Sequence, residues 1–100
     1  MAKLTTVFWR DIPAQVIAKE RRENAKIVLT ERFAEAIDKA AMRAKMAGTD
    51  AYLEQWRREE TKCGKDLQAA VDAAAENIET TFTDERLEEL VRNGGLATTD

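Results

Sequence analysis

The chain has 100 residues, with 16 basic and 19 acidic side chains, a formal net charge of −3, no histidine and one cysteine. These counts exclude a Ser-His-Asp triad, a Cys-His pair, a histidine-ligated metal site and an internal disulfide. No apolar run approaches about 18 residues, and no basic segment precedes an apolar one, so we expect neither a transmembrane helix nor a secretory signal. A pI of about 5.1 argues against a nucleic-acid partner. We therefore expect a cytoplasmic protein that binds no membrane and holds no metal or other cofactor.

The first 29 residues have the pattern of β-structure. Residues 4–10 and 26–29 are rich in β-branched and large apolar side chains, and residues 15–19 form a similar run between them. Pro13 interrupts the first connection because it has no N–H and disfavours helix at the residue before it. The polar residues 20–24 form the second connection. Three short strands with short connections favour an antiparallel meander.

From residue 30 onward the apolar side chains recur with the period of an α-helix. Residues that favour the N-cap position precede four such segments: Thr30, Thr49 or Asp50, Asp66 and Thr83. Glycines mark the expected ends of the first and last helices, at Gly48 and at Gly94–Gly95.

The second of these helices is short and is followed by a break. Its inward face is expected to carry Tyr52, Leu53 and Trp56, and residues 57–58 lie at its end. Residues 59–65 form the break, with room for a short extended piece. The order of elements is thus strands first and helices second, a pattern typical of an α+β fold.

The sequence therefore predicts a single α+β domain over residues 4–93, followed by a flexible tail at residues 94–100. Its architecture is a small antiparallel sheet of two or three N-terminal strands followed by four helices packed on it.

Cys63 is the first candidate for chemistry. It lies in the break between helices, beside Gly64 and between Lys62 and Lys65, and nearby cations favour a thiolate. The structural alternative is a semi-buried small side chain. Since the chain offers no histidine as a base and no second thiol, a hydrolase mechanism is excluded and a redox or metal-delivery role remains as a hypothesis.

The most informative segment is the connection between the first two strands. A proline-fixed corner there presents an indole, a guanidinium, a carboxylate and an amide, and the candidate binding residues are Trp9, Arg10, Asp11, Pro13 and Gln15. Trp and Arg often dominate protein interfaces. In the structural alternative, Asp11 caps the turn, Arg10 pairs with it and Gln15 satisfies backbone groups.

This corner is also part of a family resemblance. Residues 9–16, 31–33, 36–44 and 49–58 resemble, in the same order, the small bacterial "virulence factor" domain family, and the resemblance runs from about Leu4 to Arg92. A similar segment occurs in the larger conserved virulence factor C proteins, beside a NifU-like scaffold domain and helical repeats. The resemblance brings no catalytic residues to this chain. It implies a short cytoplasmic protein, and it associates stand-alone members with folate- and corrinoid-linked methyl transfer.

Three functions are compatible with these observations. The first is a non-enzymatic accessory or adaptor domain that docks on a metabolic or assembly partner protein. The second is a small-molecule-binding subunit or accessory factor of folate- or corrinoid-linked methyl transfer, with a pocket lined by Trp9, Arg10 and Gln15. The third is a redox or metal-delivery module that uses Cys63. The missing histidine, the lone cysteine and the lack of a nucleotide motif favour the first.

Overall fold

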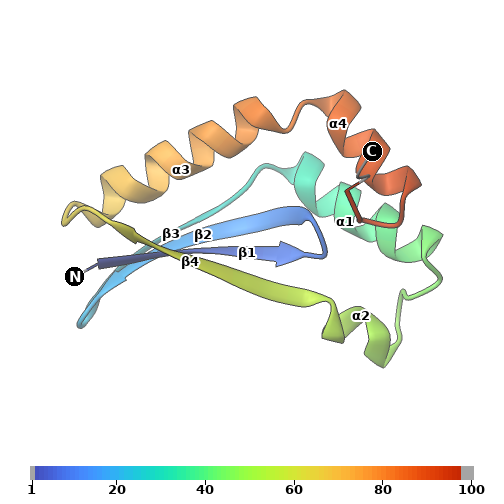
Figure 1. Cartoon of the computed structure of the whole chain (residues 1–100), viewed down its shortest axis with the longest axis horizontal. Helices are drawn as coiled ribbons and strands as arrows, with labels where there is room; N and C mark the ends of the chain where they lie inside the picture. Colours follow the sequence, from blue (N-terminus) through green and yellow to red (C-terminus); the bar gives the residue numbers. More distant parts are fainter. Residues whose placement is uncertain (1, 98–100) are drawn as a thin grey trace.

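A computed structural model describes residues 2–97 of the chain, drawn in Figure 1. Eight elements follow one another: β1 (Ala2–Trp9), β2 (Ile12–Glu20), β3 (Glu23–Val28), α1 (Glu31–Arg43), α2 (Asp50–Glu54), β4 (Trp56–Cys63), α3 (Leu67–Thr81) and α4 (Asp84–Arg92). The first three strands form the expected meander. The α+β class is therefore confirmed.

The sheet has four strands in the order β3-β2-β1-β4, and every neighbouring pair is antiparallel. The prediction that the sheet consists of only two or three N-terminal strands is wrong, because a fourth strand, β4, joins it from between α2 and α3. Its eight residues pair with β1 from Ala2↔Cys63 to Trp9↔Trp56. The unpaired edge of β1 explains this placement, since its backbone N–H and C=O groups need partners.

The second predicted helix is much shorter than expected. α2 ends at Glu54, and Trp56 begins β4 instead of occupying the inward face of a helix. Leu53 is 64% exposed, so of the three side chains expected to point inward only Tyr52 packs against the core. Cys63 accordingly ends a strand and does not lie in a loop between helices.

The first helix is also shorter than expected. α1 ends at Arg43, and Lys45 then takes a left-handed conformation at φ 60° before Gly48 is reached. Two of the expected N-caps form as predicted: the side chain of Asp66 accepts from the N–H of Ala69, and that of Thr83 accepts from the N–H of Arg86.

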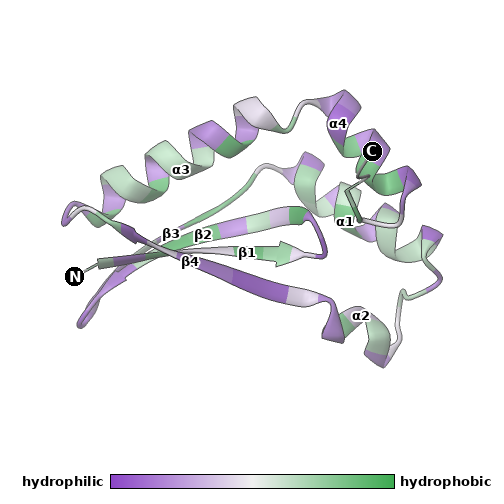
Figure 2. Ribbon diagram, in the orientation of Figure 1, coloured by the Kyte–Doolittle hydropathy of each residue, from purple (hydrophilic) through white to green (hydrophobic). Residues whose placement is uncertain are grey.

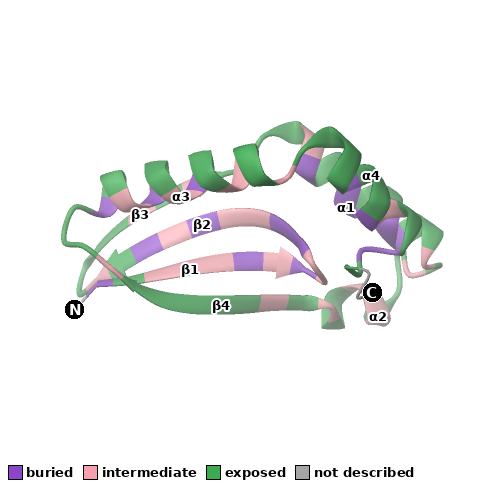
Figure 3. Ribbon diagram, turned by 45° about the horizontal axis from the view of Figure 1, so that its top comes forward, coloured by how far each residue is buried: buried purple, intermediate pink, exposed green. Residues whose placement is uncertain are grey.

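α1, α3 and α4 lie on one side of the sheet, whereas α2 lies apart from them beside the start of β4, as Figure 1 shows. α3 packs on β2 and β3, α1 packs on β2, and α4 packs mainly against α1. The expectation of four helices packed on the sheet is therefore correct only in part. Figure 2 shows apolar residues along β2 and strongly hydrophilic ones along β4, and Figure 3 shows β4 exposed over most of its length.

One hydrophobic core joins the helices to the central strands. It includes Val16 and Ala18 of β2, Phe33 and Ile37 of α1, and Val71 of α3, all nearly or fully buried. An Arg32–Glu79 ion pair of 3.0 Å ties the start of α1 to α3, and the backbone N–H and hydroxyl of Thr30 donate to the same carboxylate.

The residues after α4 pack onto the turn between β1 and β2. Gly94 and Gly95 begin the predicted tail, yet both are buried. The Gly95 carbonyl accepts from the N–H of Asp11, and the Asp11 carboxylate accepts from the N–H of Ala97. The packed part of the chain thus extends to Ala97, and residues 98–100 of the predicted tail lie outside the described residues.

Candidate functional site

The two faces of the sheet differ in what lies against them. On one face, Val16 and Ala18 of β2 meet the helices in the core. The strand register places the alternate residues on the opposite face, which we call the open face. Its members are Lys3, Thr5, Val7, Gln15, Ile17, Lys19, Asn24, Lys26, Val28, Trp56, Arg58, Glu60 and Lys62. Most of these side chains are exposed, including Val28 at 67% and Trp56 at 37%, but Val7 is buried. Trp9, directly opposite Trp56 in the register, is fully buried as well, so the face is covered where β1 ends.

Two hollows flank the exposed Trp56, and we refer to them together as the Trp56 hollow. One, of about 330 Å³, is lined by Val7, Gln15, Trp56, Arg57 and Arg58. The other, of about 150 Å³, lies where α1 passes the end of the sheet, and its lining is mostly apolar: Ala14, Val28, Leu29, Ala34, Ile37, Asp38, Tyr52 and Trp56. An exposed indole between two concavities, with an amide and two guanidinium groups beside it, suits the recognition of a protein side chain.

Aromatic stacking fixes the position of Trp56. Its ring meets Tyr52 edge-on with centroids 6.1 Å apart, and Tyr52 in turn lies 5.6 Å from the ring of Trp9. The indole N–H of Trp9 donates to the Tyr52 carbonyl at 2.9 Å. Burial, and to a smaller extent the nearby Asp38 carboxylate, raise the pKa of Tyr52, so its hydroxyl stays neutral at physiological pH.

Arg57 links the hollow to the β1–β2 turn. Its Nε donates to the carbonyl of Arg10 at 2.8 Å, its Nη2 lies 3.1 Å from the Asp11 carboxylate, and its Nη1 pairs with Glu59. The guanidinium also stacks over Phe8 at 4.4 Å. Burial alone would lower the pKa of Arg57, but the hydrogen bonds to Glu59 and Asp11 outweigh it and raise the pKa. This cation is therefore held in place by carboxylates within the chain.

The five residues of the predicted corner site separate into two groups. Trp9 is 0% exposed and Pro13 less than 2%, so neither side chain reaches the surface. Arg10, Asp11 and Gln15 are half-buried. Trp9 and Pro13 therefore lie beneath the surface patch in which we expected them. They pack under the exposed residues and do not face a partner.

Arg10 and Asp11 are occupied by contacts within the chain. Arg10 has a left-handed φ of 54° and donates to the Gln55 side chain, to the carbonyl of Gly94 and to the sulfur of Met46. Asp11 pairs with Arg57, not with Arg10. Of the five corner residues, Gln15 is the one that lines the Trp56 hollow.

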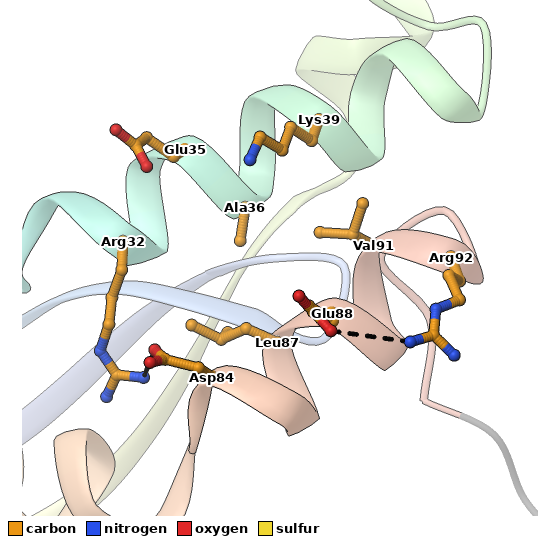
Figure 4. Close-up of a pocket in the computed structure, with 9 residues that line it drawn as sticks. All are labelled: Arg32, Glu35, Ala36, Lys39, Asp84, Leu87, Glu88, Val91 and Arg92. Atoms are coloured by element: carbon orange, nitrogen blue, oxygen red, sulfur yellow. Dashed lines mark hydrogen bonds and ion pairs between the residues drawn. The ribbon is translucent and has the colours of Figure 1, made fainter.

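A second groove lies between α1 and α4 and has a volume of about 430 Å³. Figure 4 shows its wall of alternating charges around Ala36, Leu87 and Val91. Here Arg32 pairs with Asp84 at 3.1 Å and Arg92 with Glu88 at 3.6 Å. Because these charged side chains largely pair with one another, the groove resembles an ordinary packing boundary between two helices.

A third hollow, of about 860 Å³, opens at the far end of the sheet, where Cys63 and Gly64 face the β2–β3 turn. Cys63 is half-buried and packs against the core. Within residues 2–97, no three acidic or cysteine side chains come together in a way that could hold a metal ion. No helix in that range is both long and apolar enough to cross a membrane.

Sequence reasoning missed the contribution of β4 to this site. Trp56, Arg57 and Arg58 reach the hollow only because β4 pairs with β1. The spacing of Tyr52, Leu53 and Trp56 suggested the inward face of a helix, whereas Trp56 begins a strand. The residues along β4 are mostly charged rather than alternately apolar, so no hydrophobic periodicity indicated a strand.

Comparison with known proteins agrees with the resemblance noted from the sequence. The family model described as "Virulence factor" matches residues 7–91. Searches of the curated proteins and of the solved structures return no match. The matched segment starts within β1 and ends within α4, so it includes nearly all of the packed domain. The chain belongs to the virulence factor domain family.

Proposed function

We propose that this protein is a non-enzymatic adaptor domain of the bacterial cytoplasm that docks on a partner protein through the Trp56 hollow. The observation that supports this most is the exposure of Trp56 beside two concavities, on a sheet face that the described helices leave largely uncovered. Tryptophan often contributes much of the binding free energy of an interface, because it buries a large area with little loss of conformational freedom.

The aromatic stack gives the hollow a fixed shape. Because Tyr52 and the fully buried Trp9 hold the Trp56 ring from behind, the free protein already presents the ring in position. Gln15 and Arg58 add hydrogen-bond donors at its rim. A preformed site loses little conformational entropy on binding, which favours recognition by a small surface.

A link to folate- or corrinoid-linked methyl transfer stays a prediction, and it concerns the identity of the partner. In this proposal the methyl-transfer proteins are candidates for the docked protein, and the hollow binds a protein side chain rather than the cofactor. Direct titration of the purified protein with a folate and a corrinoid separates the two ideas, since the adaptor proposal expects no binding of either.

The test uses Trp56→Ala in the full chain, purified with its partners from the native host beside the wild type. We expect one co-purifying protein to be lost while the thermal unfolding midpoint changes by only a few degrees. Leu53→Ala is the matched control because Leu53 is an exposed apolar residue on the neighbouring α2 but does not line the hollow.

Retention of every co-purifying protein by a folded Trp56→Ala variant would contradict the proposal. If Trp56→Ala unfolds, Gln15→Ala combined with Arg58→Ala keeps the test valid, since both side chains line the hollow and neither belongs to the core. Loss of the same partner in that double variant supports docking at this surface.

A further inference from the structure

Three lysines stand side by side across the open face. Lys3 on β1 is directly opposite Lys19 on β2 and directly opposite Lys62 on β4. All three are exposed, and within residues 2–97 none of their side chains makes a hydrogen bond or an ion pair. Like charges placed directly opposite each other in a sheet are destabilising. We call this arrangement the lysine row.

The open face as a whole is basic although the chain is acidic. Beyond the lysine row it carries Lys26 and Arg58, against Glu60 as its only carboxylate among the described residues. The full chain has a net charge of −3, so the excess of acidic groups lies elsewhere. A second copy docked face to face by two-fold symmetry would bring two such basic faces together, so the charges favour an acidic partner.

The spacing of the lysine row fits a helix. Neighbouring strands are about 4.8 Å apart, so the points at which the three lysine side chains leave the sheet follow one another at about that interval. Side chains at i and i+3 or i+4 on one helix flank are about 5–6 Å apart, whereas alternate side chains of an extended segment are nearly 7 Å apart. Carboxylates on a helix laid across the strands therefore match the row better than those of an extended peptide.

The Trp56 hollow lies within reach of the same helix. From Lys3 to Val7 along β1 is four residues, or about 13 Å, and Val7 lines the hollow. Trp56 lies farther along, six residues or about 20 Å from Lys62 on β4. A helix with its side chains is about 10–12 Å wide, so it would lie between the lysine row and the hollow, and the long lysine side chains on one side and the exposed Trp56 and Val28 on the other would have to reach toward it. The residues between them, Thr5 and Ile17, offer a half-buried floor of moderate size.

We propose that the open face binds an acidic amphipathic helix of a partner protein, laid across the strands. Its carboxylates pair with Lys62, Lys3 and Lys19, and its apolar flank covers Trp56 and Val28. This inference rests on the proposed function and names the chemistry of the partner. A nucleic acid fits less well, because Trp56 is the only aromatic ring that the described open face offers for base stacking.

The experiment uses a synthetic helical peptide of about 18 residues, with Glu along one flank at i, i+4 spacing and Leu along the adjacent flank. A second peptide has Gln in place of every Glu. Binding is followed by the blue shift of tryptophan emission, which reports Trp56 because Trp9 is already fully buried. We expect the Glu peptide to bind, with an affinity that falls as salt is added. The Gln peptide should bind much more weakly.

The protein variants separate charge from fold. The affinity for the Glu peptide should fall about tenfold in a triple variant, since each exposed ion pair contributes modestly. This variant combines Lys3→Gln, Lys19→Gln and Lys62→Gln. The matched control is Arg22→Gln, Lys39→Gln and Lys65→Gln, which removes the same charge from exposed positions outside the open face. It should leave the affinity unchanged.

Three results would overturn the inference. They are equal binding of the Glu and Gln peptides, equal loss in the two triple variants, and binding of phosphatidylserine vesicles or oligo-dT in place of the peptide. The proposed function is judged separately by Trp56→Ala and the host partner. If Trp56→Ala loses that partner while the lysine variant keeps it, docking stands and the acidic helix fails.

Discussion

β2 and β4 both pair with β1 over most of its length, yet different forces hold them in the sheet. β2 is fixed by burial, since Ile12, Val16 and Ala18 are each 0% exposed. β4 has no fully buried side chain and depends on its main-chain pairing with β1 and on the contacts of Arg57. The comparison shows that one sheet can combine two kinds of strand. The position of one is determined by burial of its side chains, and that of the other by main-chain pairing with the free edge of its neighbour.

The largest expected effect is on the buried side of β2. Ile12→Ala should lower the free energy of unfolding by about 2–5 kcal/mol, because it leaves a cavity in a fully buried site. Ile17→Ala is the control from the same strand, since Ile17 lies half-buried on the open face. Denaturant unfolding should give a loss for Ile17→Ala that is less than half as large. Equal losses would mean that the two faces of β2 do not differ in energy.

Two of the helix starts could be predicted from the sequence, but the fourth strand could not. The N-caps Asp66 and Thr83 act locally, through a side chain and a backbone N–H three residues away, so nearby residues suffice to reveal them. β4 could not be predicted, because its partner lies more than 40 residues away and its own residues are mostly exposed and charged.

The candidate site shows the same division. The sequence pointed to the β1–β2 corner, and of its five candidate residues Gln15 lines the Trp56 hollow. It could not show that Trp9 lies beneath the surface, because that burial depends on Gly95 at the other end of the domain. Nor could it show the lysine row, since the three lysines come from three strands whose register only the folded sheet defines.

The second prediction concerns the corner where β1, β2 and β4 meet. A Cβ added at Gly95 would lie 2.7 Å from Cζ3 of Trp9, and Gly95 has a φ of +94°. Gly95→Ala should therefore destabilise the fold by about 1–3 kcal/mol more than Gly48→Ala. Gly48 is the matched control because it has a similar positive φ of +75° but open space around it.

Thermal or denaturant unfolding of the two glycine variants measures this difference. If the two variants lose equal stability, the contact of Gly95 with Trp9 does not matter, and backbone strain alone accounts for the effect. In that case the end of β4 opposite Trp9 would be less firmly tied to the core than we infer.

The third prediction concerns the helical layer over β2, which β4 lacks. Burial alone would raise the pKa of Glu79, but hydrogen bonds from Thr30 and Arg32 and the charge of Arg32 lower it below the usual value. The folded state thus favours the carboxylate, and this stability is present above the unfolded pKa. It should be lost as the pH falls through the lower folded pKa.

Glu79→Gln measures that contribution. At pH 7 it should cost about 1 kcal/mol, and the difference from the wild type should shrink as the pH is lowered below about 4. Glu76→Gln, one turn away on α3 and exposed, is the control. A difference between wild type and Glu79→Gln that stays constant down to pH 2 would show that the charge of Glu79 is not what links α1 to α3.

The smallest expected effect is at the end of β4. Cys63→Ser should change the free energy of unfolding by at most about 0.5 kcal/mol and should leave partner capture intact, because strand pairing with Ala2 does not depend on the thiol. Denaturant unfolding measures the free energy, and mass spectrometry identifies the proteins that co-purify from the host. A folded Cys63→Ser variant that loses its cellular activity would instead favour the redox hypothesis.

The exposed outer side of β4 has a consequence for self-association. In the described chain β4 is an edge strand of eight residues, and such an edge is a template on which another molecule can add a strand. Arg57, Arg58, Glu59, Glu60 and Lys62 place charges along it on both faces. Alternating charges and the absence of an apolar run make this edge a poor nucleus for aggregation, so the same composition that hides the strand from sequence analysis protects the folded protein from intermolecular sheet growth.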